Sequence, residues 1–73
     1  MSISVADLKI IAVNGGGMVI DAKQVPVTDL KIIASNASKG GGLVTLKNAD
    51  ALSVTDLKII ASNSKGHVVL DLS

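Results

Sequence analysis

Apolar residues recur in this chain with the spacing of an amphipathic helix, and the same stretch appears three times. In the first stretch, apolar residues at i, i+3, i+6 and i+7 share one helical face: Val5, Leu8, Ile11 and Ala12. The hexapeptide Asp-Leu-Lys-Ile-Ile-Ala occurs at 7–12, 29–34 and 56–61. We therefore expect three short helices, at about 4–14, 26–36 and 53–63, in a chain built from one unit copied in tandem.

Polar residues in front of each copy predict where the helices begin. In the first and third copies a serine stands three positions before the aspartate, as in a capping box: Ser4 with Asp7, and Ser53 with Asp56. The second copy has Pro26 instead of serine, so Thr28 or Asp29 is expected to cap that helix.

Asparagine and glycine predict where the helices end, because both tolerate the left-handed conformation: Asn14 with Gly15, Asn36 with Gly40, and Asn63 with Gly66. Two glycine triplets, 15–17 and 40–42, follow a predicted helix and precede a predicted strand. A phosphate-binding loop has the opposite order, strand then helix. We interpret the triplets as helix caps and flexible connections.

A run typical of a β-strand follows each predicted helix, at 18–22, 43–47 and 67–72. Strands joined by single helices are expected to be parallel, with right-handed crossovers. One face of these runs carries threonine, lysine, aspartate and histidine, whereas a strand covered on both sides should be apolar throughout. The predicted fold class is therefore α/β: three tandem helix–strand units, about 4–25, 26–52 and 53–73, forming a parallel three-stranded sheet with helices on one face, solenoid-like. A doubly wound sheet is the alternative.

The segment Leu-Val-Thr-Leu-Lys-Asn-Ala at 43–49, followed by Leu-Ser-Val-Thr-Asp-Leu-Lys-Ile-Ile-Ala at 52–61, resembles a leucine-rich repeat of the cysteine-containing subclass. The resemblance covers most of 27–72, and Asn48 is its single candidate for the ladder asparagine. Asp29 and Asp56 are 27 positions apart, which suits that family, whereas Asp7 and Asp29 are 22 apart. The resemblance implies protein binding through the sheet face, and it implies no catalysis.

Composition narrows the class of protein. The 73 residues allow one domain with a thin core, and they contain no Phe, Trp, Tyr, Arg, Glu or Cys. Disulfides are therefore excluded, and nucleic-acid binding is disfavoured because the net charge is only +1 and stacking aromatics are missing. No secretory signal and no apolar run of about 20 residues is visible, so a cytoplasmic location is expected. A designed or consensus repeat scaffold without a natural ligand would also explain the narrow alphabet.

Candidate chemistry is sparse. His67 is the only histidine, and we expect it at the surface beside Gly66, without a catalytic or metal-binding role. Lys9, Lys31 and Lys58 recur with the aspartates of the hexapeptide, which suggests a solvated helix face of mixed charge. We predict no enzymatic activity and no cofactor.

The open face of the sheet is the predicted protein-binding site: Leu43, Thr45, Lys47, His67, Val69 and Asp71. Lys47 and Asp71 would be neighbours of opposite charge, and Val19, Asp21 and Lys23 would extend the face. The strand at 67–72 would be an unpaired edge open to another chain, and a homodimer is one form of such self-association. The predicted function is a non-catalytic module for protein–protein interaction or self-assembly, through this face or this edge. A small accessory subunit of an enzyme is the remaining alternative.

Overall fold

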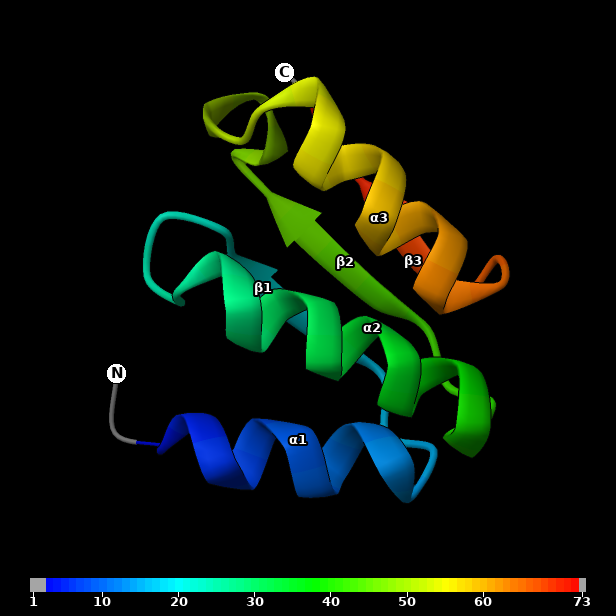
Figure 1. Ribbon diagram of the computed structural model, residues 1–73. Coiled ribbons are helices and arrows are strands. Elements are labelled where there is room, and N and C mark those ends of the chain that lie inside the picture. Colours follow the sequence, from blue (N-terminus) through cyan, green and yellow to red (C-terminus); the bar gives the residue numbers. More distant parts are fainter. Residues whose placement is uncertain (1–2, 73) are drawn as a thin grey trace.

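Helices and strands alternate along the chain in the computed structural model, which describes residues 3–72 (Figure 1). The elements are α1 Val5–Val13, β1 Met18–Asp21, α2 Val27–Gly40, β2 Val44–Lys47, η1 Ala49–Ala51, α3 Val54–Ser64 and β3 Val68–Leu70. The three α-helices lie on the same side of the sheet, one beside the next (Figure 1). The predicted alternation of helix and strand is confirmed, and the short 3-10 helix η1 was not predicted.

The sheet has the order β1-β2-β3, and both pairs of neighbours are parallel. Met18 is in register with Val44, and Val44 with Val68. The predicted parallel three-stranded sheet is confirmed, and the covering of one face by helices removes the doubly wound alternative for residues 3–72. Each strand is one to three residues shorter than its predicted run, although flanking residues such as Leu43, His67 and Asp71 still form backbone hydrogen bonds with the neighbouring strand.

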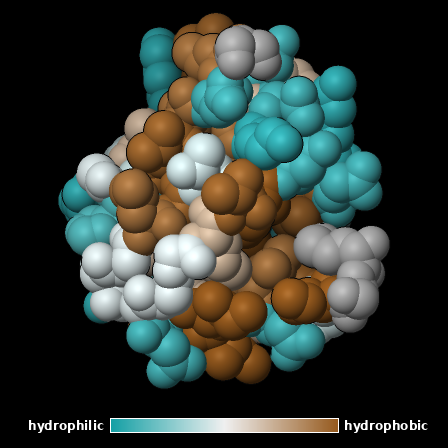
Figure 2. All heavy atoms as spheres, turned by 180° about the vertical axis from the view of Figure 1, so that it is seen from behind, coloured by the Kyte–Doolittle hydropathy of each residue, from teal (hydrophilic) through white to brown (hydrophobic). Residues whose placement is uncertain are grey.

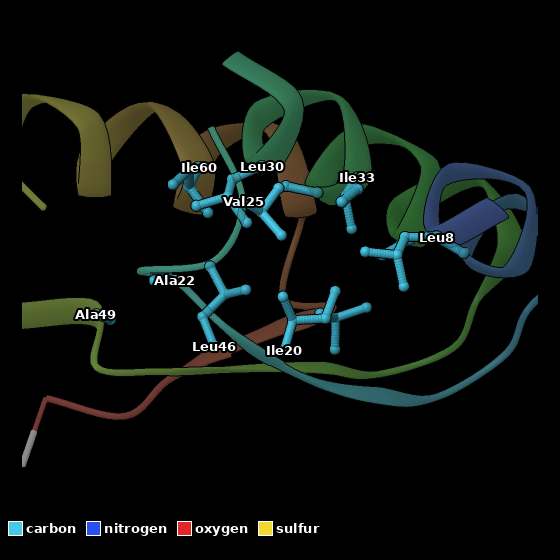
Figure 3. Packing of buried hydrophobic residues seen from close by; sticks show 13 residues of the cluster. Leu8, Ile20, Ala22, Val25, Leu30, Ile33, Leu46, Ala49 and Ile60 are labelled. Carbon is cyan, nitrogen blue, oxygen red and sulfur yellow. The ribbon is translucent and has the colours of Figure 1, made fainter. Parts of the chain in front are cut away.

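The core lies between the helix layer and the sheet, with side chains entering from both (Figure 3). Alternation along β2 turns Val44 and Leu46 towards the helices, and Ile20 does the same from β1. Because the chain has no aromatic residue, small aliphatic side chains fill this space. The buried cluster is Leu8, Ala12, Ile20, Ala22, Val25, Leu30, Ile33, Ala34, Ala37, Val44, Leu46, Ala49 and Ile60.

The N-termini of α1 and α3 are capped as predicted. The Ser4 hydroxyl oxygen accepts a hydrogen bond from the Asp7 N–H at 3.1 Å, and that of Ser53 accepts from the Asp56 N–H at 3.1 Å.

The predicted cap of α2 by Thr28 or Asp29 is wrong. Pro26 occupies the N-cap position of α2 without a side-chain hydrogen bond, and both predicted residues lie in the first turn. The fixed φ of proline already suits the entry to a helix, so this helix begins without a side-chain cap.

The helix ends agree with the prediction in α1, and in part in α3, where Gly66 has the predicted left-handed conformation with a φ of +88°. Asn14 is the C-cap of α1 and Gly15 follows with a φ of +87°. Helix α2 continues past Asn36 to Gly40, and the left-handed residue is Gly41; α3 likewise contains Asn63 and ends before Lys65. The predicted stop at Asn36 is therefore wrong, whereas Asn63 lies one residue before the end of α3; the side chains of both asparagines bond to the preceding helix.

The glycine triplets are places of close backbone contact, so their interpretation as flexible connections is wrong at Gly40 and Gly42. A Cβ added to Gly40 would lie 2.7 Å from the Gly15 nitrogen and 2.8 Å from the Val13 oxygen. A Cβ added to Gly42 would lie 2.8 Å from the Gly15 carbonyl carbon. The end of α1 and the loop after α2 therefore touch backbone to backbone.

Candidate protein-binding surfaces

The face of the sheet turned away from the helices carries a central apolar row. The register places Thr45 between Val19 and Val69, and these two valines are 68% and 44% exposed. Leu43, just before β2, adds a side chain that is 51% exposed. Figure 2 views the molecule from this side and shows apolar surface lying between polar groups. The predicted neighbours Thr45 and Val69 are thus side by side.

Charged groups border this row at the C-terminal end of the strands. Lys47 is exposed and in register with Asp21 of β1. The Asp21 carboxylate accepts a hydrogen bond from the Asn48 side-chain amide at 3.0 Å and another from the Lys23 N–H at 2.9 Å. These two bonds, the first above all, lower the pKa of Asp21 and keep it ionised.

The predicted neighbour of Lys47 on the other side, Asp71, continues the ladder beyond β3. Its N–H donates to the Leu46 carbonyl at 2.9 Å, and its own carbonyl accepts from the Ala49 N–H at 3.0 Å. Asp71 is thus fixed beside the end of β2 by its backbone.

His67 lies beside Gly66 and is partly exposed, as expected, and it also contacts the loop before β2. Its side chain is half-buried, and Nδ1 lies 2.8 Å from the Gly42 carbonyl oxygen. Because a carbonyl can only accept, this contact places the proton on Nδ1. Within residues 3–72, no group of three or more His, Cys, Asp or Glu side chains is arranged to hold a metal ion.

Polar contacts between neighbouring helices form a second set, which sequence reasoning missed. The Lys9 ammonium pairs with the Asp29 carboxylate at 2.8 Å, and that of Lys31 with Asp56 at 3.0 Å. The predicted solvated face of mixed charge is thus a set of partly buried pairs that join one helix to the next. The spacing in the hexapeptide could have indicated these pairs. Its aspartate and lysine are two positions apart, so they point to different sides of the helix and can each reach a different neighbouring helix.

The asparagines seven positions after the aspartates of the second and third hexapeptides also join neighbouring helices. The Asn36 side-chain amide donates to the Lys9 carbonyl at 3.0 Å, and that of Asn63 to the Lys31 carbonyl at 3.3 Å. Each of these bonds therefore joins a helix to the one before it. Asn14, at the same position of α1, donates instead to its own helix, to the Ile10 carbonyl at 2.9 Å.

The two ends of this row of helices are exposed and differ from each other. We call the head the surface of Asp7, Ile11 and Asn14 on α1 with the outer edge of β1. We call the tail the surface of Val54, Lys58 and Ala61 on α3 with the outer edge of β3: these are the sheet's two edge strands. The head includes an apolar cavity of about 310 Å³, whose lining includes Leu8, Ile11, Met18 and Ile20.

Comparison with known proteins supplies no relative. The chain matches no protein-family model, and no curated protein or solved structure matches it. No helix in residues 3–72 is long and apolar enough to cross a membrane. The function proposed next therefore depends on the geometry of the exposed surfaces.

Proposed function

We propose that this chain is a non-catalytic repeat module of solenoid-like layout that binds another protein through the open face of its sheet. The observation that carries the proposal is the bare face itself. Parallel sheets are almost always covered on both sides, and here helices cover only one. An uncovered parallel sheet is a surface that a second molecule can cover.

The composition of this face fits a protein contact. Exposed Val19, Leu43 and Val69 surround Thr45 in the middle of the face, and Lys47 lies at its border. Protein interfaces commonly join an apolar centre to a polar rim. Strands also present side chains at fixed spacing, so the face has a defined shape before a partner arrives.

The solenoid-like layout is supported because the same polar contacts recur between neighbouring helices; we call each such set of contacts a joint. Lysine–aspartate pairs and asparagine–carbonyl bonds occur in the same arrangement between α1 and α2 and between α2 and α3. Repeated joints of this kind hold one unit against the next in stacked repeat proteins. The resemblance to leucine-rich repeats, which implies binding through the same sheet face, agrees with this proposal.

A non-catalytic role is proposed because the one histidine has a structural contact. His67 Nδ1 is engaged by the Gly42 carbonyl, so this ring nitrogen is committed to holding the loop before β2. The His67→Ala variant tests this role. If any turnover found for the native chain disappeared in that variant while the fold persisted, the non-catalytic proposal would be wrong.

The binding face is tested by affinity enrichment followed by reconstitution. The immobilised chain is compared with Leu43→Asp/Val69→Asp, and the matched control is Ile10→Asp/Ile32→Asp, which alters equally exposed isoleucines on the helix layer. We expect a recovered protein, once purified, to bind the native chain and the control in titration calorimetry. It should not bind Leu43→Asp/Val69→Asp. Equal binding to the folded sheet variant would refute the sheet face as the site.

A further inference from the structure

The joints inside the chain show what a helix of this sequence places on each side. On the side of the following helix it offers the lysine of the hexapeptide and that lysine's carbonyl oxygen. On the side of the preceding helix it offers the aspartate and the asparagine seven positions later. The hexapeptide is identical in α1, α2 and α3, so the head offers Asp7 and Asn14, and the tail offers Lys58.

At these two ends the charged side chains lack the partner that their equivalents have within the chain, and Asn14 donates to the Ile10 carbonyl of its own helix instead of to another helix. In residues 3–72 neither Asp7 nor Lys58 takes part in a salt bridge, and both are exposed, whereas the equivalent paired side chains are partly buried. The head thus carries the negative group, and the tail carries the positive group that completes the joint.

Burial of the same hexapeptide residues shows that each end lacks one neighbour. Ile33 and Ile60 are 1% and 0% exposed, but Ile11 at the head is only half-buried. The alanine of the hexapeptide shows the same for the side of the following helix. Ala12 and Ala34 are fully buried, whereas Ala61 at the tail, where no helix follows, is exposed.

The head offers an apolar cavity, and the tail offers exposed apolar side chains that could fill it. The cavity at the head lies between α1 and β1, where no preceding unit covers it. The tail exposes Val54 at 66%, and Leu57 and Leu70 are only partly buried. These side chains occupy the positions by which one unit packs on the next inside the chain.

We propose that copies of this chain stack head to tail, the tail of one copy covering the head of the next. Lys58 then pairs with the neighbouring copy's Asp7, the neighbouring copy's Asn14 donates to the Lys58 carbonyl, and β3 pairs in parallel with the neighbouring copy's β1. The occupant of both ends is a second copy, because these contacts repeat the two joints within the chain. Such a contact is heterologous, so it gives open filaments or closed rings rather than a two-fold dimer. It uses the ends of the molecule and leaves Leu43 and Val69 of the sheet face uncovered, whereas Val19 also lines the cavity at the head.

The decisive variant is Ala61→Arg. Ala61 is exposed in the single chain, so a large side chain there leaves the monomer folded, yet it would fill the place that a following α1 must occupy. The matched control is Ser62→Arg, which alters the next, equally exposed residue of α3. Sedimentation velocity with interference optics follows assembly, because the chain has no aromatic residue for absorbance near the usual protein band.

We expect the native chain and the Ser62→Arg control to form concentration-dependent species larger than a dimer across the micromolar range, and Ala61→Arg to be monomeric. A charge cycle adds a second readout. Asp7→Lys and Lys58→Asp should each weaken association by about three- to tenfold, and the double swap, which restores opposite charges, should recover most of it.

A native chain that stays monomeric throughout would overturn the stacking proposal, as would assembly that survives in folded Ala61→Arg. If assembly were lost only in Leu43→Asp/Val69→Asp, self-association would run through the sheet face instead. That last result would overturn head-to-tail stacking while supporting the sheet face as a binding site, so the two proposals fail separately.

Discussion

The close contact between the two glycine triplets predicts that Gly40→Ala lowers the free energy of unfolding, whereas helix propensity alone predicts that it raises it. Gly40 is the last residue of α2 and does not have a positive φ. Replacing glycine by alanine in a helix normally stabilises, by up to about 1 kcal/mol at interior positions. We predict that Gly40→Ala destabilises this chain, because the added Cβ meets the Gly15 nitrogen and the Val13 oxygen within 2.8 Å.

The magnitude follows from which atoms are in the way. They belong to the backbone, so they cannot rotate aside, and overpacking a tight contact costs about 1–3 kcal/mol. With the propensity gain subtracted, we expect a net loss of about 1 kcal/mol. A domain of this size has a total stability of roughly 4–11 kcal/mol, so the loss should lower the melting temperature by roughly 4–8 °C.

The assay is urea unfolding followed by far-UV circular dichroism, because the chain has no Trp or Tyr for fluorescence. Gly41→Ala is the control: nothing lies within 4 Å of its added Cβ, but its φ is +85°, so it should lose about 1–2 kcal/mol from backbone strain alone. A Gly40→Ala chain that is as stable as the native one, or more stable, would refute the close contact.

Three further predictions follow from the contacts described. The pKa of Asp56 is lowered, first because of its bond from Lys31. The contribution of its carboxylate to stability is therefore present above about pH 4 and lost on acidification, so in acid titrations the stability advantage of the native chain over Asp56→Asn should shrink as the pH falls below about 4. Asn36→Ala should cost about 1 kcal/mol in urea unfolding, more than Asn14→Ala, because only Asn36 bonds to another helix; equal losses would contradict this. Leu46→Ala should cost about 2–5 kcal/mol and Leu43→Ala less than about 0.5, since only Leu46 is buried, and thermal unfolding would show a reversed order if the sheet faces were misassigned.

The features that the sequence predicted are those with local causes. Ser4 and Ser53 cap helices through residues three positions away, and alternation within β2 decides which of its side chains face the helices. The parallel sheet also followed, because a single helix between two strands leaves few other connections.

The features that the sequence did not predict depend on residues distant in the chain. Asn36 resembles a helix stop when read alone, but its partner is the Lys9 carbonyl, 27 positions earlier. The histidine contact and the packing of Gly40 against Gly15 are of the same kind. For the proposed binding face, the sequence indicated which side chains share it, but their exposure depends on where three helices lie.

Because the hexapeptide is identical in all three helices, the first and last helices carry the same contact residues as the middle one. Stacked repeat proteins normally end in units whose outer side is polar, because the last unit has no neighbour. Here the exposed side of α3 carries Val54 and Ala61, and the exposed side of α1 borders an apolar cavity. Neither described end has such a polar cap, and the hexapeptide that builds the internal joints leaves an aspartate at one end and a lysine at the other. We therefore expect the contacts that hold one unit to the next within the chain to act also between molecules, as the stacking proposal requires.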